Sequence, residues 1–184
     1  MKKLPLFVKI LIGLFVVVAI FLIVAAFQPS HFEVKRSTRI VAPPASVFPQ
    51  VNTLKNWEAW NPWMKLDPNI KVTYSGPPSG EGASYSWVGN NEVGEGRMTI
   101  LESRPNELVR FKLEFLKPME GKSDAAFTFK PQGDQTEVTW SMSGENNLIA
   151  KAVCLIMSMD KMIGEPFEKG LADMKSIVES TPKK

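Results

Sequence analysis

Hydrophobic and polar residues alternate with a period of two in seven short segments of this chain, which is the pattern of half-buried β-strands. The clearest segment runs from Val109 to Phe115, where apolar residues alternate with Arg110, Lys112 and Glu114. The other six predicted strands are residues 32–40, 70–75, 83–87, 98–100, 125–129 and 138–142. Because turn residues such as those of 89–91 and 131–134 separate these segments, we expect one antiparallel sheet.

The first predicted strand is less regular than the others. Phe32, Val34 and Ile40 alternate with charged residues, but the pattern is disturbed near Arg36 and Ser37. A β-bulge, which inserts one extra residue into a strand, would account for this disturbance. We therefore expect a bulge at Arg36 and Ser37.

Beyond Gly144 the apolar period changes to that of a helix. Five apolar residues follow one another at spacings of three and four, as on the buried face of an amphipathic helix. These residues are Phe167, Leu171, Met174, Ile177 and Val178. Gly164 and Pro166 interrupt the apolar stretch before this stripe, so we expect the C-terminal helix to follow them. The helix is the expected cover for the hydrophobic face of the sheet.

A second apolar stretch covers residues 148–159. With about 12 residues it is too short to cross a bilayer. Two interpretations stay open: the stretch packs on the domain, which we expect, or it lies on a membrane surface.

Near the N-terminus, an unbroken apolar run extends from Ile10 to Phe27, 18 residues without a charge. A helix needs about 20 such residues to cross a bilayer, whereas the apolar core of a secretory signal has about 7 to 15. We therefore expect an uncleaved anchor that contacts the membrane through residues 4–27. A cleaved signal ending at Val24-Ala25-Ala26, or a helix buried in a soluble protein, is the alternative. The predicted organisation is an anchor (1–27), a linker (28–31) and one domain (32–181).

Charges beside the apolar run bear on its orientation. Three basic residues precede the run and three follow it: Lys2, Lys3 and Lys9, then Lys35, Arg36 and Arg39. The positive-inside rule gives most weight to charges near the first span. We expect a single-pass protein of the cell membrane with a cytoplasmic N-terminus and an extracytoplasmic C-terminal domain.

Composition narrows the range of functions. The chain has 22 basic and 19 acidic residues, and the three lysines before the apolar run account for its net charge of +3. Because the rest is balanced and contains no basic or basic-aromatic run, we expect no nucleic-acid partner. Cys154 is the single cysteine, which excludes a disulfide framework.

Catalytic and metal-binding signatures are sparse. The only histidine, His31, lies beside the apolar run, and one His with one Cys cannot form the usual zinc site or a Ser-His-Asp relay inside the domain. Glu58, Glu81, Glu92 and Glu95 lie near loops, where solvated acids are more common than a desolvated acid–base pair. We therefore expect no catalytic residue, no metal ligand and no cofactor.

Five segments of the chain resemble the START/Bet v 1-like superfamily of helix-grip domains, and its polyketide cyclase/dehydrase-like branch in particular. These segments are Ser37–Pro44 leading to Val47-Phe48, Trp57–Trp63, Gly82–Trp87, Thr136–Trp140 and Phe167–Leu171. The resemblance covers roughly Phe32 to Ser180, and Trp60-Asn61-Pro62-Trp63 is its most specific motif. It implies an α+β helix-grip fold: a seven-stranded antiparallel sheet wrapped around a long C-terminal helix, with a ligand cavity between them. The N-terminal transmembrane helix is additional.

Inward aromatic and methionine side chains are the candidate ligand-binding residues. The chain has five Trp, eleven Phe and nine Met, and most aromatic residues of the domain fall on one face of a predicted strand. Ordinary core packing is one interpretation, and an apolar cavity lined by flexible methionines is the other. The candidate lining residues are Trp60, Tyr85, Trp87, Met98, Phe111, Phe127, Trp140, Met142, Phe167 and Leu171.

Three functions follow from these observations. We favour a membrane-anchored binding or carrier domain for a small hydrophobic molecule or lipid, without catalytic machinery. The resemblance suggests a polyketide cyclase/dehydratase-like enzyme as the first alternative. An envelope protein-interaction module, whose protein partner the sequence does not identify, is the second.

Overall fold

The computed structural model describes residues 5–181. Its α-helices are α1 (Leu6–Ala26), α2 (Pro44–Asn52), α3 (Trp57–Trp60), α4 (Leu148–Ile156) and α5 (Met159–Ser180). Its strands are β1 (His31–Ile40), β2 (Lys71–Ser75), β3 (Ser84–Val88), β4 (Glu95–Arg104), β5 (Leu108–Lys117), β6 (Gly121–Gln132) and β7 (Gln135–Glu145). Three residues used in the predictions lie outside the described residues: Lys2 and Lys3, used for the orientation, and Leu4, the first residue of the expected membrane contact.

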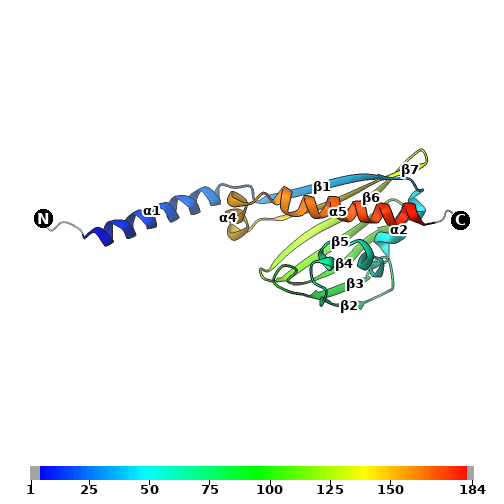
Figure 1. The fold of residues 1–184 in the computed structure, drawn as a ribbon, viewed down its shortest axis with the longest axis horizontal. Coiled ribbons are helices and arrows are strands. Elements are labelled where there is room, and N and C mark those ends of the chain that lie inside the picture. Colours follow the sequence, from blue (N-terminus) through cyan, green and yellow to red (C-terminus); the bar gives the residue numbers. More distant parts are fainter. Residues whose placement is uncertain (1–4, 182–184) are drawn as a thin grey trace.

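The seven strands form one antiparallel sheet in the order β1-β7-β6-β5-β4-β3-β2. The sheet curves around α5, which lies along its concave face, and α2 and α3 are part of the connection between β1 and β2 (Figure 1). Every predicted strand is present, and so is the covering C-terminal helix. The predicted helix-grip fold is therefore confirmed.

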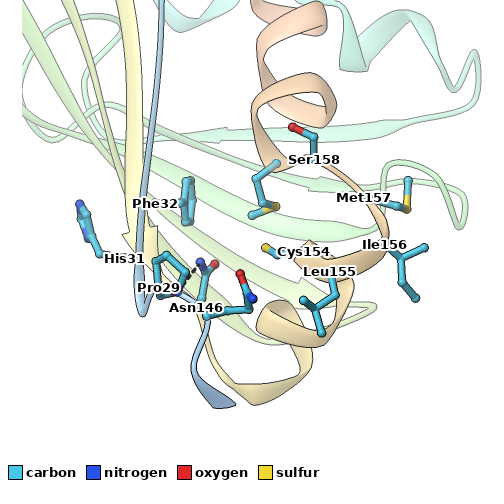
Figure 2. A pocket seen from close by; sticks show the side chains of 11 residues that line it. Pro29, His31, Phe32, Asn146, Cys154, Leu155, Ile156, Met157 and Ser158 are labelled. Carbon is cyan, nitrogen blue, oxygen red and sulfur yellow. Dashed lines mark hydrogen bonds between the residues drawn. The ribbon is translucent and has the colours of Figure 1, made fainter. Parts of the chain in front are cut away.

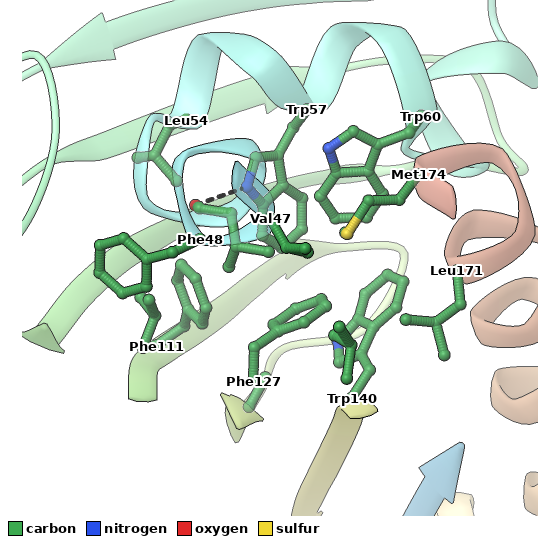
Figure 3. Close-up of a cluster of buried hydrophobic side chains, with 14 of the residues drawn as sticks. Val47, Phe48, Leu54, Trp57, Trp60, Phe111, Phe127, Trp140, Leu171 and Met174 are labelled. Atoms are coloured by element: carbon green, nitrogen blue, oxygen red, sulfur yellow. Dashed lines mark hydrogen bonds between the residues drawn. The ribbon is translucent and has the colours of Figure 1, made fainter. Parts of the chain in front are cut away.

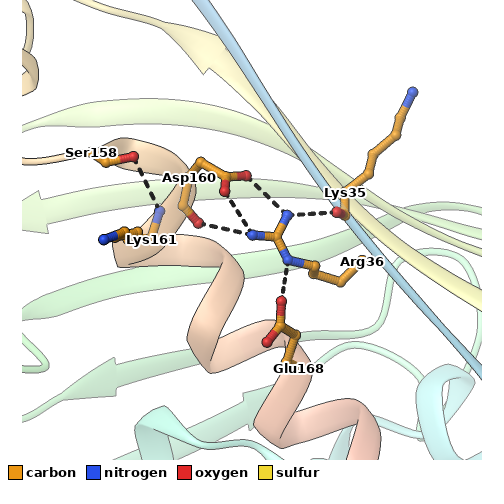
Figure 4. Close-up of polar contacts among 6 residues, drawn as sticks. All are labelled: Lys35, Arg36, Ser158, Asp160, Lys161 and Glu168. Atoms are coloured by element: carbon orange, nitrogen blue, oxygen red, sulfur yellow. Dashed lines mark hydrogen bonds and ion pairs between the residues drawn. The ribbon is translucent and has the colours of Figure 1, made fainter.

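The expected bulge near Arg36 and Ser37 is wrong. Strand β1 pairs with β7 in continuous register along its whole length, and the register shifts of the sheet occur between β4 and β5. Arg36 instead extends its guanidinium to α5, where it binds Asp160 at 2.8 Å and also Glu168 (Figure 4). A side chain at Gly164 would overlap this guanidinium, so the helix leaves room for it. The Arg36 charge is therefore paired with two carboxylates of α5, and the strand needs no bulge at this position.

Helix α5 also begins earlier than expected. Gly164 and Pro166, which were expected to precede the helix, lie within it. A proline in a helix interior removes one backbone hydrogen bond and costs about 3 kcal/mol or more in an isolated context. Here Arg36 binds Asp160 and Glu168 on either side of the proline, so both turns are held against the same strand. This tertiary contact supports a continuous helix.

The centre of the domain is a cluster of aromatic side chains from the sheet, α3 and α5, which we call the aromatic cluster. Trp140 of β7 stacks on Phe167 of α5 with ring centroids 3.9 Å apart, and on Phe127 of β6 at 4.8 Å. Trp57 and Trp60 pack edge-on against the Trp140 ring (Figure 3). Both indole N–H groups donate to backbone carbonyls of α2, so these large side chains are buried with their polar atoms paired.

Helix α1 extends away from the domain, and α4 lies beside its C-terminal end (Figure 1). Among the described residues of α1, Ala25 alone is buried. The helix is long and apolar enough to cross a membrane, a test that a signal sequence also passes. The expectation that residues 148–159 pack on the domain is wrong for α4, because α4 packs against α1 and none of its nine described residues is buried.

Truncating Leu171 to alanine should destabilise the domain by about 2–5 kcal/mol, the usual cost of emptying a buried leucine site. Leu171 is 1 % exposed on the face of α5 that covers the sheet. All five tryptophans lie outside α1, so their fluorescence during urea unfolding of the full chain in detergent micelles reports on the domain. Lys169→Ala, at an exposed position of the same helix, is the control and should change the stability by less than about 0.5 kcal/mol. If both substitutions changed the free energy of unfolding equally, the buried face of α5 would be misassigned.

The Arg36 network should make the stability depend on pH on the acid side. Hydrogen bonds from the Arg36 guanidinium hold the pKa of Asp160 below its usual value. A carboxyl with a lowered pKa stabilises the fold above its unfolded pKa, about 3.9, and this stability is lost as the pH falls through the folded pKa. The difference in unfolding free energy between wild type and Arg36→Met should therefore shrink below about pH 5. A difference that stays constant down to about pH 2 would contradict this role.

Candidate functional site: a cavity between the sheet and helix α5

The sheet and α5 enclose a cavity of about 440 Å³. Its walls come mainly from strands β3 to β7, from the segment around α3 and from the first turns of α5, and Phe32 of β1 and Ala150 of α4 also line it. The open end lies where the β5–β6 loop approaches the start of α5, because the lining residues there are exposed. Small-molecule pockets have volumes of about 300–1,000 Å³ and mostly apolar walls, and this cavity has both properties.

Six of the ten predicted ligand-binding residues line this cavity: Tyr85, Trp87, Met98, Trp140, Met142 and Phe167. The other four lie in the packed core: Trp60, Phe111, Phe127 and Leu171. Each of these four is at most 1 % exposed, because α2, α3 and the aromatic cluster fill that part of the interior. They can act on a ligand only through the side chains that line the cavity.

The cavity wall also contains residues that were not predicted from the sequence to bind a ligand, among them Asn61, Trp63, Leu113, Phe115 and Ser123. Leu113 and Phe115 continue the inward face of β5, so the alternation identified their face but not the open space beside them. Ser123 lies two residues before the inward Ala125, and residues two apart on a strand point to the same face. This spacing is the signal in the sequence that Ser123 points inward. Asn61 and Trp63 belong to the most specific motif of the sequence.

Three buried polar side chains interrupt the apolar wall: Asn61, Tyr85 and Ser123. Burial raises the pKa of the Tyr85 hydroxyl far above its usual value, and the nearby Asn61 amide offsets part of this effect. Tyr85 is therefore neutral at physiological pH and keeps its O–H as a donor. The Oδ1 of Asn61 accepts a bond from the backbone N–H of Trp63 at 3.0 Å, which orients the amide. One hydroxyl or carbonyl group of a ligand would find partners here.

The position of Trp87 depends on Gly96 of the neighbouring strand. A side chain at Gly96 would overlap the six-membered ring of Trp87, so a glycine permits this close approach. The Trp87 Nε1–H donates to the carbonyl of Val93 at 3.2 Å, and the ring packs edge-on against Phe115. These contacts hold Trp87 as a wall near the open end of the cavity.

The loop acids have different environments. Glu58 accepts a hydrogen bond from the Tyr74 hydroxyl at 2.7 Å, and Glu95 forms an ion pair with Lys117 at 2.7 Å. Of the four acids named from the sequence, all within the described chain, Glu92 alone lines the cavity, at an exposed position. Among residues 5–181, no three side chains of His, Cys, Asp or Glu gather in a way that could hold a metal ion.

Comparison with known families gives one match over most of the chain. A family model described as "Polyketide cyclase / dehydrase and lipid transport" matches residues 31–179. This description agrees with a domain that binds hydrophobic molecules. No curated protein matches the chain.

Solved structures share the fold at low sequence identity. Protein MLL2253 from Mesorhizobium loti superposes with a TM-score of 0.61 at 14 % identity, covering 83 % of this chain and 100 % of its own. The Aha1 dimer from Colwellia psychrerythraea has a TM-score of 0.58 at 16 % identity, covering 81 % and 97 %. Protein CV1439 from Chromobacterium violaceum has a TM-score of 0.57 at 14 % identity, covering 84 % and 100 %. At such identities the likeness concerns the fold alone.

Gly96→Ala should force the Trp87 ring out of its place against β4 and into the cavity. Because the added methyl group overlaps the ring and also the backbone carbonyl oxygen of Glu114, we expect a loss of about 1–3 kcal/mol, the usual cost of overpacking. Urea unfolding measures this loss, and near-ultraviolet circular dichroism reports the altered Trp87 environment. The matched control is Gly121→Ala, where the nearest atom, on Phe115, lies 4.0 Å from the added carbon. If both variants behave alike, the close approach of Trp87 to β4 is not what requires the glycine.

Proposed function

This chain belongs to the polyketide cyclase / dehydrase and lipid transport family, and on this premise we propose that it is a membrane-anchored carrier that binds a small hydrophobic molecule. The observation that supports the proposal best is the cavity of about 440 Å³ beneath α5. Its wall combines aromatic rings with flexible methionines, which adapt to the shape of an apolar ligand.

The cavity also limits the chemical class of the ligand. Its interior is apolar apart from Asn61, Tyr85 and Ser123, so it favours a molecule with one polar group and an apolar body. A single-chain lipid, or a ring system with one hydroxyl or carbonyl, has this character. The neutral Tyr85 hydroxyl would donate to the polar group while the remaining wall excludes water.

Binding without chemical conversion is the role that we favour. His31 is not among the residues that line the cavity, and Glu92 lines it at an exposed position. A cyclase or dehydratase is the second candidate, because Tyr85 and Asn61 are placed to bind a substrate carbonyl. In that role Tyr85 would polarise the carbonyl by hydrogen bonding.

Helix α1 supports a membrane location. Its described residues are almost entirely exposed, and their apolar surface would be costly in water. We propose that α1 is an uncleaved, single-pass anchor and that the domain lies on the extracytoplasmic side. The orientation follows from the weight that the positive-inside rule gives to the lysines before the first span.

Ala125→Phe should close the cavity. Ala125 is 6 % exposed and lines the cavity from β6, so a phenyl ring there would occupy the ligand's space. A chain beginning at Ser30 should bind anthroyloxy-labelled stearic acid with a Kd of about 1 μM, or roughly −8 kcal/mol. Ala125→Phe should weaken binding by at least about tenfold, or 1.4 kcal/mol. Quenching of tryptophan fluorescence by the probe measures both affinities.

The neighbouring Ala126 provides a matched control. It lies on the opposite face of the same strand, so Ala126→Phe adds the same ring outside the cavity and should leave the affinity unchanged. Equal affinities in all three proteins would contradict binding in the cavity. Absence of probe binding to the wild type would make the protein-interaction module the leading function. Turnover of a polyketide-like substrate that Tyr85→Phe abolishes would favour the enzyme.

A further inference from the structure

The open end of the cavity and the end of α1 lie on the same side of the domain. The opening is bordered by Phe32 at the start of β1, by Pro118 and Met119 in the β5–β6 loop, and by Met162 in the first turn of α5. Four residues separate the end of α1 from the start of β1, and four residues span at most about 14 Å. A membrane that holds α1 is therefore within reach of the opening.

Helix α4 lies at this junction and exposes an apolar face. Ile149 and Ile156 are 59 % and 78 % exposed, and their spacing of seven residues places them on one face, two turns apart. Lys151 is the one charged residue among the nine described residues of α4, and its Nζ donates to the carbonyl of Ala26 at 3.4 Å. Its side chain therefore reaches the end of α1.

Neither its length nor its packing on the domain accounts for the stability of α4. Isolated helices shorter than about 12–15 residues are marginal in water, and all nine described residues of α4 remain at least partly exposed. Between α4 and the start of β1 lies a shallow pocket of about 410 Å³, lined by His31, Asn146, Cys154 and Met157 among others (Figure 2). The helix thus stands apart from the sheet, next to α1, with its apolar face uncovered.

We propose that α4 and the β5–β6 loop form a membrane-contacting surface that holds the opening of the cavity against the bilayer. A hydrophobic molecule then passes between the leaflet and the cavity without crossing water. This inference rests on the proposed function, because it needs both an anchored α1 and a ligand in the cavity. It adds the source of that ligand, which is the membrane that holds the anchor.

The position of α4 favours a bilayer over a protein partner. Its apolar face is continuous with α1, and a helix with one apolar face beside a spanning helix suits the interface of the same membrane. Leu116 and Met119, 56 % and 44 % exposed, add apolar surface on the other side of the opening. Lys122 follows this loop, and a lysine can bury its stem while its charge stays at the headgroups. At the opposite end of the sheet, the hairpin turns carry polar residues: Asn106, Glu107 and Asp134.

The first experiment measures the depth of α4. In the full chain reconstituted in phosphatidylcholine vesicles, Cys154→Ser with Ile156→Cys provides one site for a nitroxide label. The collision rates of the label with oxygen, which concentrates in the bilayer, and with a water-soluble nickel complex report its depth. We expect oxygen-rich, nickel-poor contact at position 156. A label at Leu101→Cys, on the distal half of β4 and 44 % exposed, should show the reverse. Nickel contact at position 156 equal to that at position 101 would overturn the proposal.

The second experiment measures transfer. Anthroyloxy-labelled stearic acid is preloaded into the vesicles, and quenching of tryptophan fluorescence follows its entry into the cavity. Replacing both isoleucines (Ile149→Gln with Ile156→Gln) keeps residues that favour helices but removes the apolar face. We expect entry to slow by about tenfold, which corresponds to about 1.4 kcal/mol of activation free energy. Leu101→Gln is the matched control and should leave the rate unchanged.

A water-borne probe separates this inference from the proposed function. Anilinonaphthalene sulfonate added from solution should bind wild type and the double variant equally, because its route does not use α4. If wild type and the double variant bind both probes and the stearic acid probe enters both proteins at the same rate, the membrane-contacting surface is overturned and the carrier function stays intact. If wild type binds neither probe, the carrier function is overturned, and this inference with it. If wild type is not retained in the vesicles, the anchor is overturned, and this inference with it.

Discussion

The rest of the domain depends on the stack of Trp140 on Phe167. The two rings lie 3.9 Å apart and 9° from parallel, and they join β7 to the covering helix α5. A side chain at Gly170, one turn further along, would come within 3.0 Å of the same tryptophan. The glycine therefore lets the helix approach the sheet, and the stack determines the height of α5 above it. That height also sets the depth of the cavity.

The same stack divides the interior into a filled half and an open half. On one side, Trp140 packs against Phe127, Trp57 and Trp60, and aromatic side chains of this size bury about 150–250 Å² each. On the other side, Trp140 and Phe167 line the cavity. The filled half supplies packing that the open half lacks. Trp140 and Phe167 belong to both halves, so the packing of the core and the shape of the cavity depend on the same two side chains.

Antiparallel pairing explains why α1 and the opening of the cavity meet at one end. His31, the first residue of β1, pairs with Glu145, the last residue of β7. The segments that precede β1 and follow β7 are α1 and α4, so they must emerge side by side. The β5–β6 loop reaches the same end, because Ser123 of β6 pairs with Gly144 of β7. Helix α1, helix α4 and the cavity opening thus share one side as a consequence of strand register.

The sequence by itself determined the features that depend on local spacing. Alternation identified all seven strands and their inward faces, the stripe from Phe167 to Val178 identified the covering helix, and the charge-free run from Ile10 to Phe27 identified α1. Tertiary structure decided the rest. Arg36 needs no bulge because its partners, Asp160 and Glu168, come from a distant helix. Phe111 and Leu113 share one face of β5, yet Leu113 borders open space and Phe111 does not. Period-two spacing reports which face a side chain occupies, whereas packing from other elements decides whether the space before it is filled.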